Sequence, residues 1–212
     1  MSVNIGSTKI ERIYIGSTEI DAGYIGDTPV YVRPYTTSSL SSWDKYEEGD
    51  NTCAYHYGGS DAAGTHNVTN VISVTVPGYI KELLNHSGVA IQCKIEGKTS
   101  AKVISNNYTW FGGKDQGYTV TYMTAVAGSN SNKSSEVNSG TVGVSATGKS
   151  TKKVEDQAIS CTVNVPANTS AVSLTLTIAA TRLDTAQVQM WCCGKFYDLT
   201  AKFIVTAPAA IA

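Results

Sequence analysis

The chain has 212 residues and a formal net charge of −1, and 16% of its residues are charged. An ordinary globular domain carries roughly 25% charged residues, and a nucleic-acid-binding domain adds a basic excess that this chain lacks, so we expect no nucleic acid partner. No run of 18 apolar residues is present, so we expect no membrane-spanning helix.

The first residues, Met1 to Gly6, have neither the basic region nor the apolar core of a signal peptide, so we expect the chain to fold in a reducing cytoplasm. Thr, Ser, Val and Gly dominate the composition. The β-branched side chains of Val and Thr suit a pleated, half-buried surface. The composition therefore predicts an all-β protein.

A ten-residue repeat opens the chain. Ile-Gly-Ser-Thr-Lys-Ile at residues 5–10 recurs as Ile-Gly-Ser-Thr-Glu-Ile at 15–20 and as Ile-Gly-Asp-Thr-Pro-Val at 25–30. Each copy predicts a short strand, a turn at the glycine and a second short strand. Such strands are too short to bury a core by themselves, so the segment is expected to need a second copy of the chain or another protein as partner. Pro34 is expected to end the pairing.

This repeat resembles the N-terminal segments of tailed-bacteriophage structural proteins, including head fibres, capsid decoration proteins and tail or baseplate appendages. The resemblance covers residues 3 to 33 and implies a short β-prism or β-helix-like segment that docks the protein on the particle, often as a trimer. It implies a virion component more than a position on the virion. The alternative is a small β-meander at the start of an ordinary domain. The residues expected to dock or oligomerise are Ile5, Ile10, Ile13, Tyr14, Ile15, Ile20, Tyr24, Ile25, Val30 and Tyr31.

Residues 35–70 are rich in Ser, Thr, Gly and Asp and predict a loop-rich lead-in with one or two strands. After it, alternating patterns separated by turn residues predict about nine strands, which is typical of a β-sandwich or jelly roll. The expected strands are 71–76, 89–95, 101–110, 118–123, 140–146, 158–165, 172–179, 186–193 and 199–206.

Two further segments of this region have distinct patterns. Residues 79–86 carry Ile80, Leu83 and Leu84 on one helical face and predict one short helix that caps the sandwich. Residues 128–139 consist almost wholly of Gly, Ser, Asn and charged residues, and predict a solvated, mobile loop.

Residues 143–150, Gly-Val-Ser-Ala-Thr-Gly-Lys-Ser, match the phosphate-binding pattern G-x4-G-K-S letter for letter. That pattern requires a strand before it and a helix after it, because the helix N-terminus and the loop amides hold the phosphates. A β pattern follows here, and no apolar strand ending in Asp is available to hold magnesium. We therefore favour a hairpin loop that carries Lys149 over a nucleotide site.

The five cysteines are an odd set without disulfide spacing, and Cys93 and Cys161 are expected to be buried free thiols. The adjacent Cys192 and Cys193 would face opposite sides of a strand, one in the core and one exposed or at an interface. Cys53 and His56, with His66, lack a fourth ligand, so we expect no metal site, and each His, including His86, is expected in a loop or on the surface.

The remaining candidates are carboxylates and aromatic side chains. The acidic residues Asp44, Glu47, Glu48, Asp50 and Asp61 are expected in a solvated loop, although a glycosidase would require two carboxylates that face each other across a cleft. Aromatic rings near Asn and Asp can bind sugars. The candidate ligand-binding residues are Trp110, Trp191 and Tyr57, with the alternative that both tryptophans belong to the core.

The sequence thus predicts an N-terminal repeat over residues 1–34 and a β-sandwich over residues 35–212. The function expected is that of a phage structural protein, a surface-attached fibre or decoration protein assembled in the bacterial host cytoplasm, with virion proteins and copies of itself as partners. No catalytic residue, metal or cofactor is expected. The alternatives are a receptor-binding, lectin-like module that recognises a host-surface glycan, and an enzyme.

Overall fold

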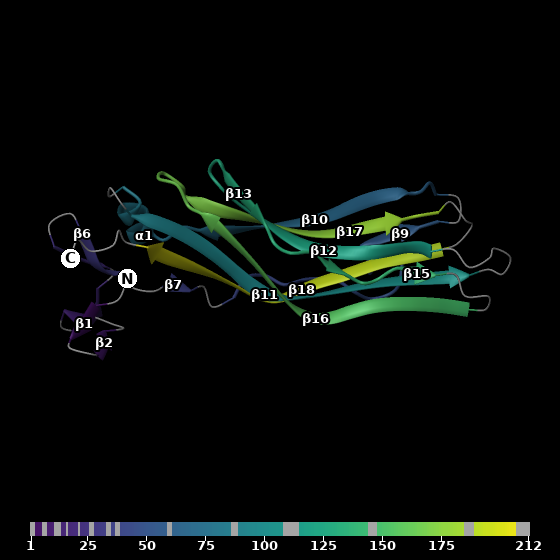
Figure 1. The fold of residues 1–212 in the computed structure, drawn as a ribbon, viewed down its shortest axis with the longest axis horizontal. Coiled ribbons are helices and arrows are strands. Elements are labelled where there is room, and N and C mark those ends of the chain that lie inside the picture. The colour runs from purple at the N-terminus through teal and green to yellow at the C-terminus, as the bar shows by residue number, and fades with distance from the viewer. Residues whose placement is uncertain are drawn as a thin grey trace.

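The structure, a computed structural model, is all-β and consists of two antiparallel sheets packed as an elongated β-sandwich, preceded by short N-terminal hairpins (Figure 1). It describes residues 3–5, 8–10, 14–15, 17–20, 22–25, 28–32, 35–36, 39–58, 61–85, 89–107, 115–143, 148–184 and 189–206.

The first sheet has the strand order β10-β17-β12-β13. Its strands are β10 (Gly64–Thr75), β17 (Ala171–Arg182), β12 (Asp115–Ala127) and β13 (Asn130–Lys133). Two shorter strands, β14 (Val137–Asn138) and β15 (Val142–Gly143), pair with β12 beyond the end of β13. One long border of this sheet is therefore β10, and the other consists of β13, β14 and β15 in succession.

The second sheet has the order β16-β11-β18 and is built from three long strands. They are β16 (Gly148–Asn164), β11 (Ala90–Asn107) and β18 (Gln189–Thr206). The free edge of β18 is covered by β7 (Tyr35–Thr36), β8 (Trp43–Lys45) and β9 (Tyr55–Tyr57), which all pair with it. The predicted lead-in at 35–70 thus holds three short strands and the start of β10.

The core lies between the two sheets and follows the two-residue period of the strands. In β17 every second residue from Val172 to Ile178 is buried in it, and in β11 the inward residues include Ile91, Cys93 and Ile95. The short helix α1 (Gly78–Leu83) closes one end with Ile80 and Leu83 buried. The predicted cap helix is therefore confirmed, although it ends earlier than expected.

Two pairs of predicted strands are single strands in the structure. The segments predicted at 186–193 and 199–206 both belong to β18, and those at 89–95 and 101–110 both contribute to β11. In β18 the inward positions are even numbers up to Phe196 and odd numbers from Leu199 onward. A bulge in the pairing with β11 at Glu96–Lys98 inserts one residue and produces this change of phase. The sequence pattern therefore shows a break where the strand has only a bulge.

The prediction of a mobile loop at 128–139 is wrong. Residues 130–133 form β13, which returns antiparallel along β12, and Val137–Asn138 form β14. Polar side chains hold the segment against the sheet: the amides of Asn130 and Asn132 donate to the carbonyl oxygens of Asn164 and Thr162 at 3.0 and 2.7 Å. A polar composition predicts a solvated loop when the side chains have only water as partner. Here the polar side chains hydrogen-bond to the neighbouring strand β16, so the segment is ordered.

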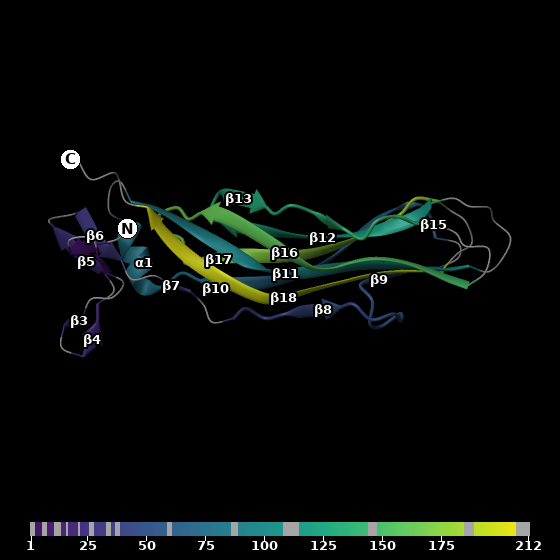
Figure 2. The same ribbon diagram turned by 60° about the horizontal axis from the view of Figure 1, so that its bottom comes forward.

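The N-terminal repeat forms three separate two-stranded hairpins. They are β1 (Val3–Ile5) with β2 (Thr8–Ile10), β3 (Tyr14–Ile15) with β4 (Thr18–Glu19), and β5 (Ala22–Ile25) with β6 (Thr28–Val32). Figures 1 and 2 show them beyond the end of the sandwich where β7 and α1 lie. No sheet joins the hairpins to one another in the described residues. The two short strands expected of each repeat are present as a pair, and a prism or helix built from these units stays a prediction.

Candidate functional site

Each N-terminal hairpin has the same register at its turn. Ile5 pairs with Thr8, Ile15 with Thr18 and Ile25 with Thr28. Among the expected docking residues, Ile15 has a described side chain that is 74% exposed, and Ile20 is partly buried. The strands of the hairpins contain most of the other expected docking residues: Ile5, Ile10, Tyr14, Tyr24, Ile25, Val30 and Tyr31. Ile13 lies outside the described residues.

A second feature is residues 43–57, called here the cover segment. Its middle lies over the outer face of β18, and its two ends, β8 and β9, pair with the edge of that strand. Its Tyr46 and Cys53 are buried against Trp191, Cys193 and Ile104, so a small apolar cluster forms outside the main core. The ring of Tyr46 lies between the ammonium groups of Lys102 and Lys195, 4.2 and 4.8 Å from its centroid. The cover segment therefore gives the outer face of β18 a partner of its own, which the loop-rich lead-in predicted for residues 35–70 did not include.

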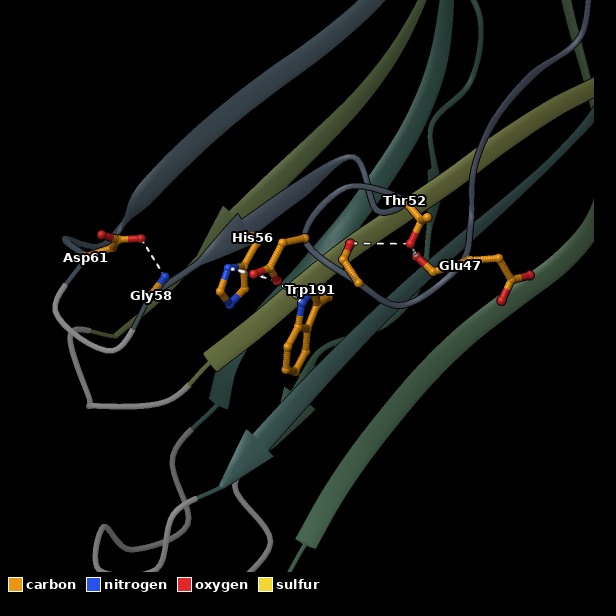
Figure 3. Close-up of polar contacts among 8 residues, drawn as sticks. Glu47, Thr52, His56, Gly58, Asp61 and Trp191 are labelled. Atoms are coloured by element: carbon orange, nitrogen blue, oxygen red, sulfur yellow. Dashed lines mark hydrogen bonds and ion pairs between the residues drawn. The ribbon is translucent and has the colours of Figure 1, made fainter.

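Trp191 is at the centre of the contacts between the cover segment and β18 (Figure 3). Its indole Nε1 donates to the Asp50 carboxylate at 2.9 Å, and its ring stacks on His56 with centroids 5.0 Å apart and an interplanar angle of 14°. The same Asp50 oxygen lies 3.3 Å from Nδ1 of His56. Only 8% of the surface of Trp191 is exposed, so its ring has no open face on which a sugar could stack. Trp191 is therefore a residue of a buried cluster, which was the alternative to ligand binding.

Tyr57 is buried on the inner side of the same sheet, with 1% of its surface exposed. Its hydroxyl donates to the carbonyl oxygen of Ala180 at 2.7 Å and lies 3.0 Å from that of Gly64, which ties β9 to the facing sheet. Burial raises the pKa of Tyr57 to about 12. Tyr57 is therefore placed to join the sheets and not to stack on a sugar. Trp110, the third candidate ligand-binding residue, lies outside the described residues.

Cys192 and Cys193 point to opposite sides of β18, as predicted, but both are buried. Cys192 lies between the sheets beside Val103 and Met190, whereas Cys193 lies under the cover segment. The prediction of one exposed thiol is wrong because residues 43–57 cover the outer face. Burial raises the pKa of both thiols to about 12, so at neutral pH neither is a thiolate that could act as a nucleophile. Cys93 and Cys161 are buried free thiols, as predicted.

The G-K-S motif does not have the structure that a phosphate site requires. Gly148, Lys149 and Ser150 begin strand β16, so a strand and not a helix follows the glycine. The ammonium of Lys149 pairs with the Glu48 carboxylate of the cover segment and lies 5.8 Å from the centroid of the Trp191 ring. Lys149 thus fastens the cover segment to the edge of the sheet.

The carboxylates of the acidic stretch make separate local contacts. Asp44 accepts the backbone N–H of Tyr46 at 2.9 Å, and Asp61 accepts that of Gly58 at 2.6 Å. Glu48 pairs with Lys149, and Asp50 with Trp191 and His56. Each of these four carboxylates therefore stabilises a turn or holds the cover segment in place.

His66 is exposed on β10 and stacks on Tyr55, with centroids 4.2 Å apart. His56 is half-buried within the cover segment, and His86 lies outside the described residues. Among the described side chains no three His, Cys, Asp or Glu residues gather as a metal site would require. The described helix is also too short to cross a membrane.

No known protein family matches the chain. No curated protein is significantly similar to it either. Any functional conclusion therefore depends on the chain's own geometry.

Proposed function

We propose that the chain is a structural component of a bacteriophage particle, a surface-attached fibre or decoration protein that docks through its N-terminal hairpins. The observation that supports this most directly is the repeated pairing of Ile5 with Thr8, Ile15 with Thr18 and Ile25 with Thr28. Two-stranded hairpins are marginally stable by themselves in water, so three in succession need a surface to pack against. An isoleucine that is 74% exposed, Ile15, is suited to such a contact.

The partners proposed are the capsid or tail proteins of the particle and further copies of the chain, joined as a trimer by stacked hairpins. The sandwich over residues 35–212 then projects from the particle. Its described groups support a non-catalytic role: the buried thiols are protonated at neutral pH, and Lys149 is paired with Glu48. The work proposed is assembly through non-covalent contacts, with no cofactor.

The test of docking uses two single variants in the second hairpin. Ile15→Asp places a charge on the proposed contact, and Ser17→Asp places the same charge on an exposed turn residue, where the third repeat naturally has Asp27. By light scattering we expect Ile15→Asp to be a folded species with one third of the wild-type mass, and Ser17→Asp to keep the wild-type mass. Equal masses for all three proteins would contradict a role of the hairpins in joining copies.

The test of the virion assignment is recovery from particles. The chain should be found at a fixed stoichiometry in gradient-purified particles of the phage that encodes it, and an antibody against the sandwich should label their surface. Its absence from purified particles would exclude the proposal.

The alternative of a glycan-binding module has less support. Trp191 and Tyr57 are buried, and Trp110 lies outside the described residues. A glycan array probed with wild type and Trp110→Ala decides it, because specific binding that this substitution removes without unfolding the protein would favour recognition over assembly.

A further inference from the structure

The four long borders of the two sheets differ in how they are protected from pairing with other chains. An exposed edge strand presents unpaired N–H and C=O groups, and proteins usually shield it with charged side chains, bulges or a covering segment. In the described residues the outer border of β12 carries β13, β14 and β15, and that of β18 carries β7, β8 and β9. No further strand of the described residues pairs with the two remaining long borders, those of β16 and β10.

The β16 border is shielded by charge and by a bulge. Its sequence includes Lys149, Lys152, Lys153 and Glu155, and the pairing with β11 shifts register between Thr99 and Ala101. Asp156, at this bulge, has a left-handed backbone with φ 57°. Charges and a bulge of this kind hinder the approach of a second strand.

The β10 border has none of these features. Its twelve residues, Gly-Thr-His-Asn-Val-Thr-Asn-Val-Ile-Ser-Val-Thr, contain no Asp, Glu, Lys, Arg or Pro. They pair with β17 from Gly64 to Thr75 without any shift of register, so the strand is regular over its whole length. Figure 1 shows β10 along one border of the sandwich.

The side chains of β10 are also suited to a further strand. Val71 is 61% exposed, and Val68 and Ile72 are only partly buried. These β-branched side chains would form favourable cross-strand pairs with a further strand. A regular, uncharged, Val- and Thr-rich strand at a sheet edge has the sequence signature of a segment that pairs with other chains. The exposed edge, the regular register and the absence of charge therefore point to the same contact.

We propose that the edge of β10, over residues 67–73, pairs antiparallel with the same edge of a second copy of this chain. Two copies related by a two-fold axis then continue the first sheet across the contact. Pairing centred on Asn70 keeps the two faces in phase, with Val68 opposite Ile72 and Thr69 opposite Val71. No charge opposes a like charge in this arrangement, whereas a β16 pair would bring lysines together.

A second copy is the occupant that the chemistry of the strand favours. The contact is isologous, so one uncharged strand supplies both halves of it. The inference concerns the sandwich and is independent of docking through the hairpins, because the two contacts use different parts of the chain. If the hairpins join copies as a trimer, the β10 contacts join two trimers as a hexamer.

The test measures the mass of the full-length protein by sedimentation over a wide range of protein concentration. Val71→Lys places a charge at the proposed contact on a side chain that is already 61% exposed, so the fold should be retained. The control is Val126→Lys, a 37% exposed valine on the same outer face of the same sheet, but on β12, whose border is occupied. Far-UV circular dichroism checks that each variant is folded.

We expect Val71→Lys to halve the mass of wild type and Val126→Lys to leave it unchanged. The halving is expected whether the hairpins contribute a trimer or not, so failure of the docking proposal would not be confused with failure of this one. An equimolar mixture of Val71→Lys and Val71→Glu should recover the wild-type mass, because the two side chains at position 71, which are diagonal neighbours in this register, then carry opposite charges. A wild-type mass that folded Val71→Lys does not change, or a wild type that stays monomeric at every concentration, would overturn the inference.

Discussion

Asp156 of β16 and Asp198 of β18 have the same left-handed backbone, with φ of 57° and 54°, and they lie on either side of the central strand β11. Each is next to a register shift, one at Thr99–Ala101 and the other at Glu96–Lys98. The hydroxyl of Tyr197 donates a hydrogen bond to the Asp156 carboxylate and joins the two bulges across β11. In both neighbours of β11, the strands β16 and β18, one extra residue therefore switches which alternate side chains face inward. The two switches lie at the same level along the sheet.

The first prediction concerns the backbone at Asp198. A left-handed conformation costs roughly 1–2 kcal/mol for a residue with a Cβ, and a β-branched residue tolerates it least, whereas glycine adopts it freely. We expect Asp198→Val to lower the free energy of unfolding by about 1–2 kcal/mol and Asp198→Gly to change it by less than about 0.5 kcal/mol.

Urea denaturation followed by circular dichroism measures both variants. The ion pair of Asp198 with Lys98, 3.4 Å apart and largely exposed, contributes little and is lost in both, so the difference between them reports the backbone. Lys202→Val, at an exposed position of the same strand, is the control for introducing a β-branched side chain. Equal losses for the Val and Gly variants would show that φ at this position is not constrained.

The second prediction concerns Gly117, at the start of β12, where the two sheets approach closely. A Cβ added there would lie 2.1 Å from the Thr181 carbonyl oxygen and 2.8 Å from the Met190 side chain, and the carbonyl is backbone that cannot rotate away. We expect Gly117→Ala to lower the free energy of unfolding by about 1–3 kcal/mol or more.

Gly143→Ala is the matched control, because a Cβ there meets nothing within 4 Å. We expect that variant to be neutral or more stable by about 0.4–1 kcal/mol, since alanine restricts the unfolded chain. Thermal unfolding of the two proteins side by side makes the comparison. Similar unfolding midpoints for Gly117→Ala and Gly143→Ala would show that the strands around Gly117 accommodate a Cβ without loss of stability.

The sequence predicts the sandwich because alternation with a period of two is a local signal, and β17 shows it without interruption from Val172 to Ile178. It does not predict the length of β18, because a bulge changes the phase of alternation and resembles the end of a strand. The pairing of two short strands in each repeat is also predictable, since the same pattern of residues recurs every ten positions.

The cover segment could not be predicted from a local pattern. Tyr46 and Cys53 are separated by polar residues, and they become a cluster only because β18 lies beneath them. One indirect signal was present: Trp191 and Cys193 are large or apolar residues on the outward face of a strand whose inward face is also apolar. Apolar residues on both faces of a strand indicate a second covering layer.

The third prediction concerns the Asp50 carboxylate, which accepts from Trp191 and fixes the cover segment. Removing the acceptor leaves a buried indole N–H unpaired, which costs about 1–3 kcal/mol. We expect Asp50→Ala to release the cover segment before the sandwich unfolds. Cys53 in the segment and Cys193 beneath it should then react with a thiol reagent, while Cys93 between the sheets stays protected.

Mass spectrometry after timed alkylation identifies which cysteines react. Asp50→Asn is the control, because its amide oxygen can still accept the indole N–H. Cys53 and Cys193 should then react as slowly as in wild type. If Asp50→Ala exposed all five thiols at one rate, the cover segment would be shown to open only with global unfolding.

The fourth prediction concerns stability at alkaline pH. Burial raises the pKa of Cys93, Cys192 and Cys193 from 9.0 to about 12, so each thiol keeps its proton in the folded chain over a range where the unfolded chain loses it. Their contribution to stability is fully present below pH 9 and is lost as the pH rises toward 12. We expect the free energy of unfolding to fall across this window, by roughly 1 kcal/mol per pH unit for each thiol.

Urea denaturation at successive pH values measures that slope, and a substitution assigns it. Cys192→Ala removes one titrating group, so its slope above pH 9 should be smaller than that of wild type by about one proton, whatever it costs in packing. Ile178→Val is the control, because it removes a buried methylene at a cost of about 0.5–1.5 kcal/mol without removing a titrating group, and its slope should equal that of wild type. Parallel curves for wild type and Cys192→Ala would mean that the Cys192 thiol titrates alike in the folded and unfolded chains, which its burial between the two sheets does not allow.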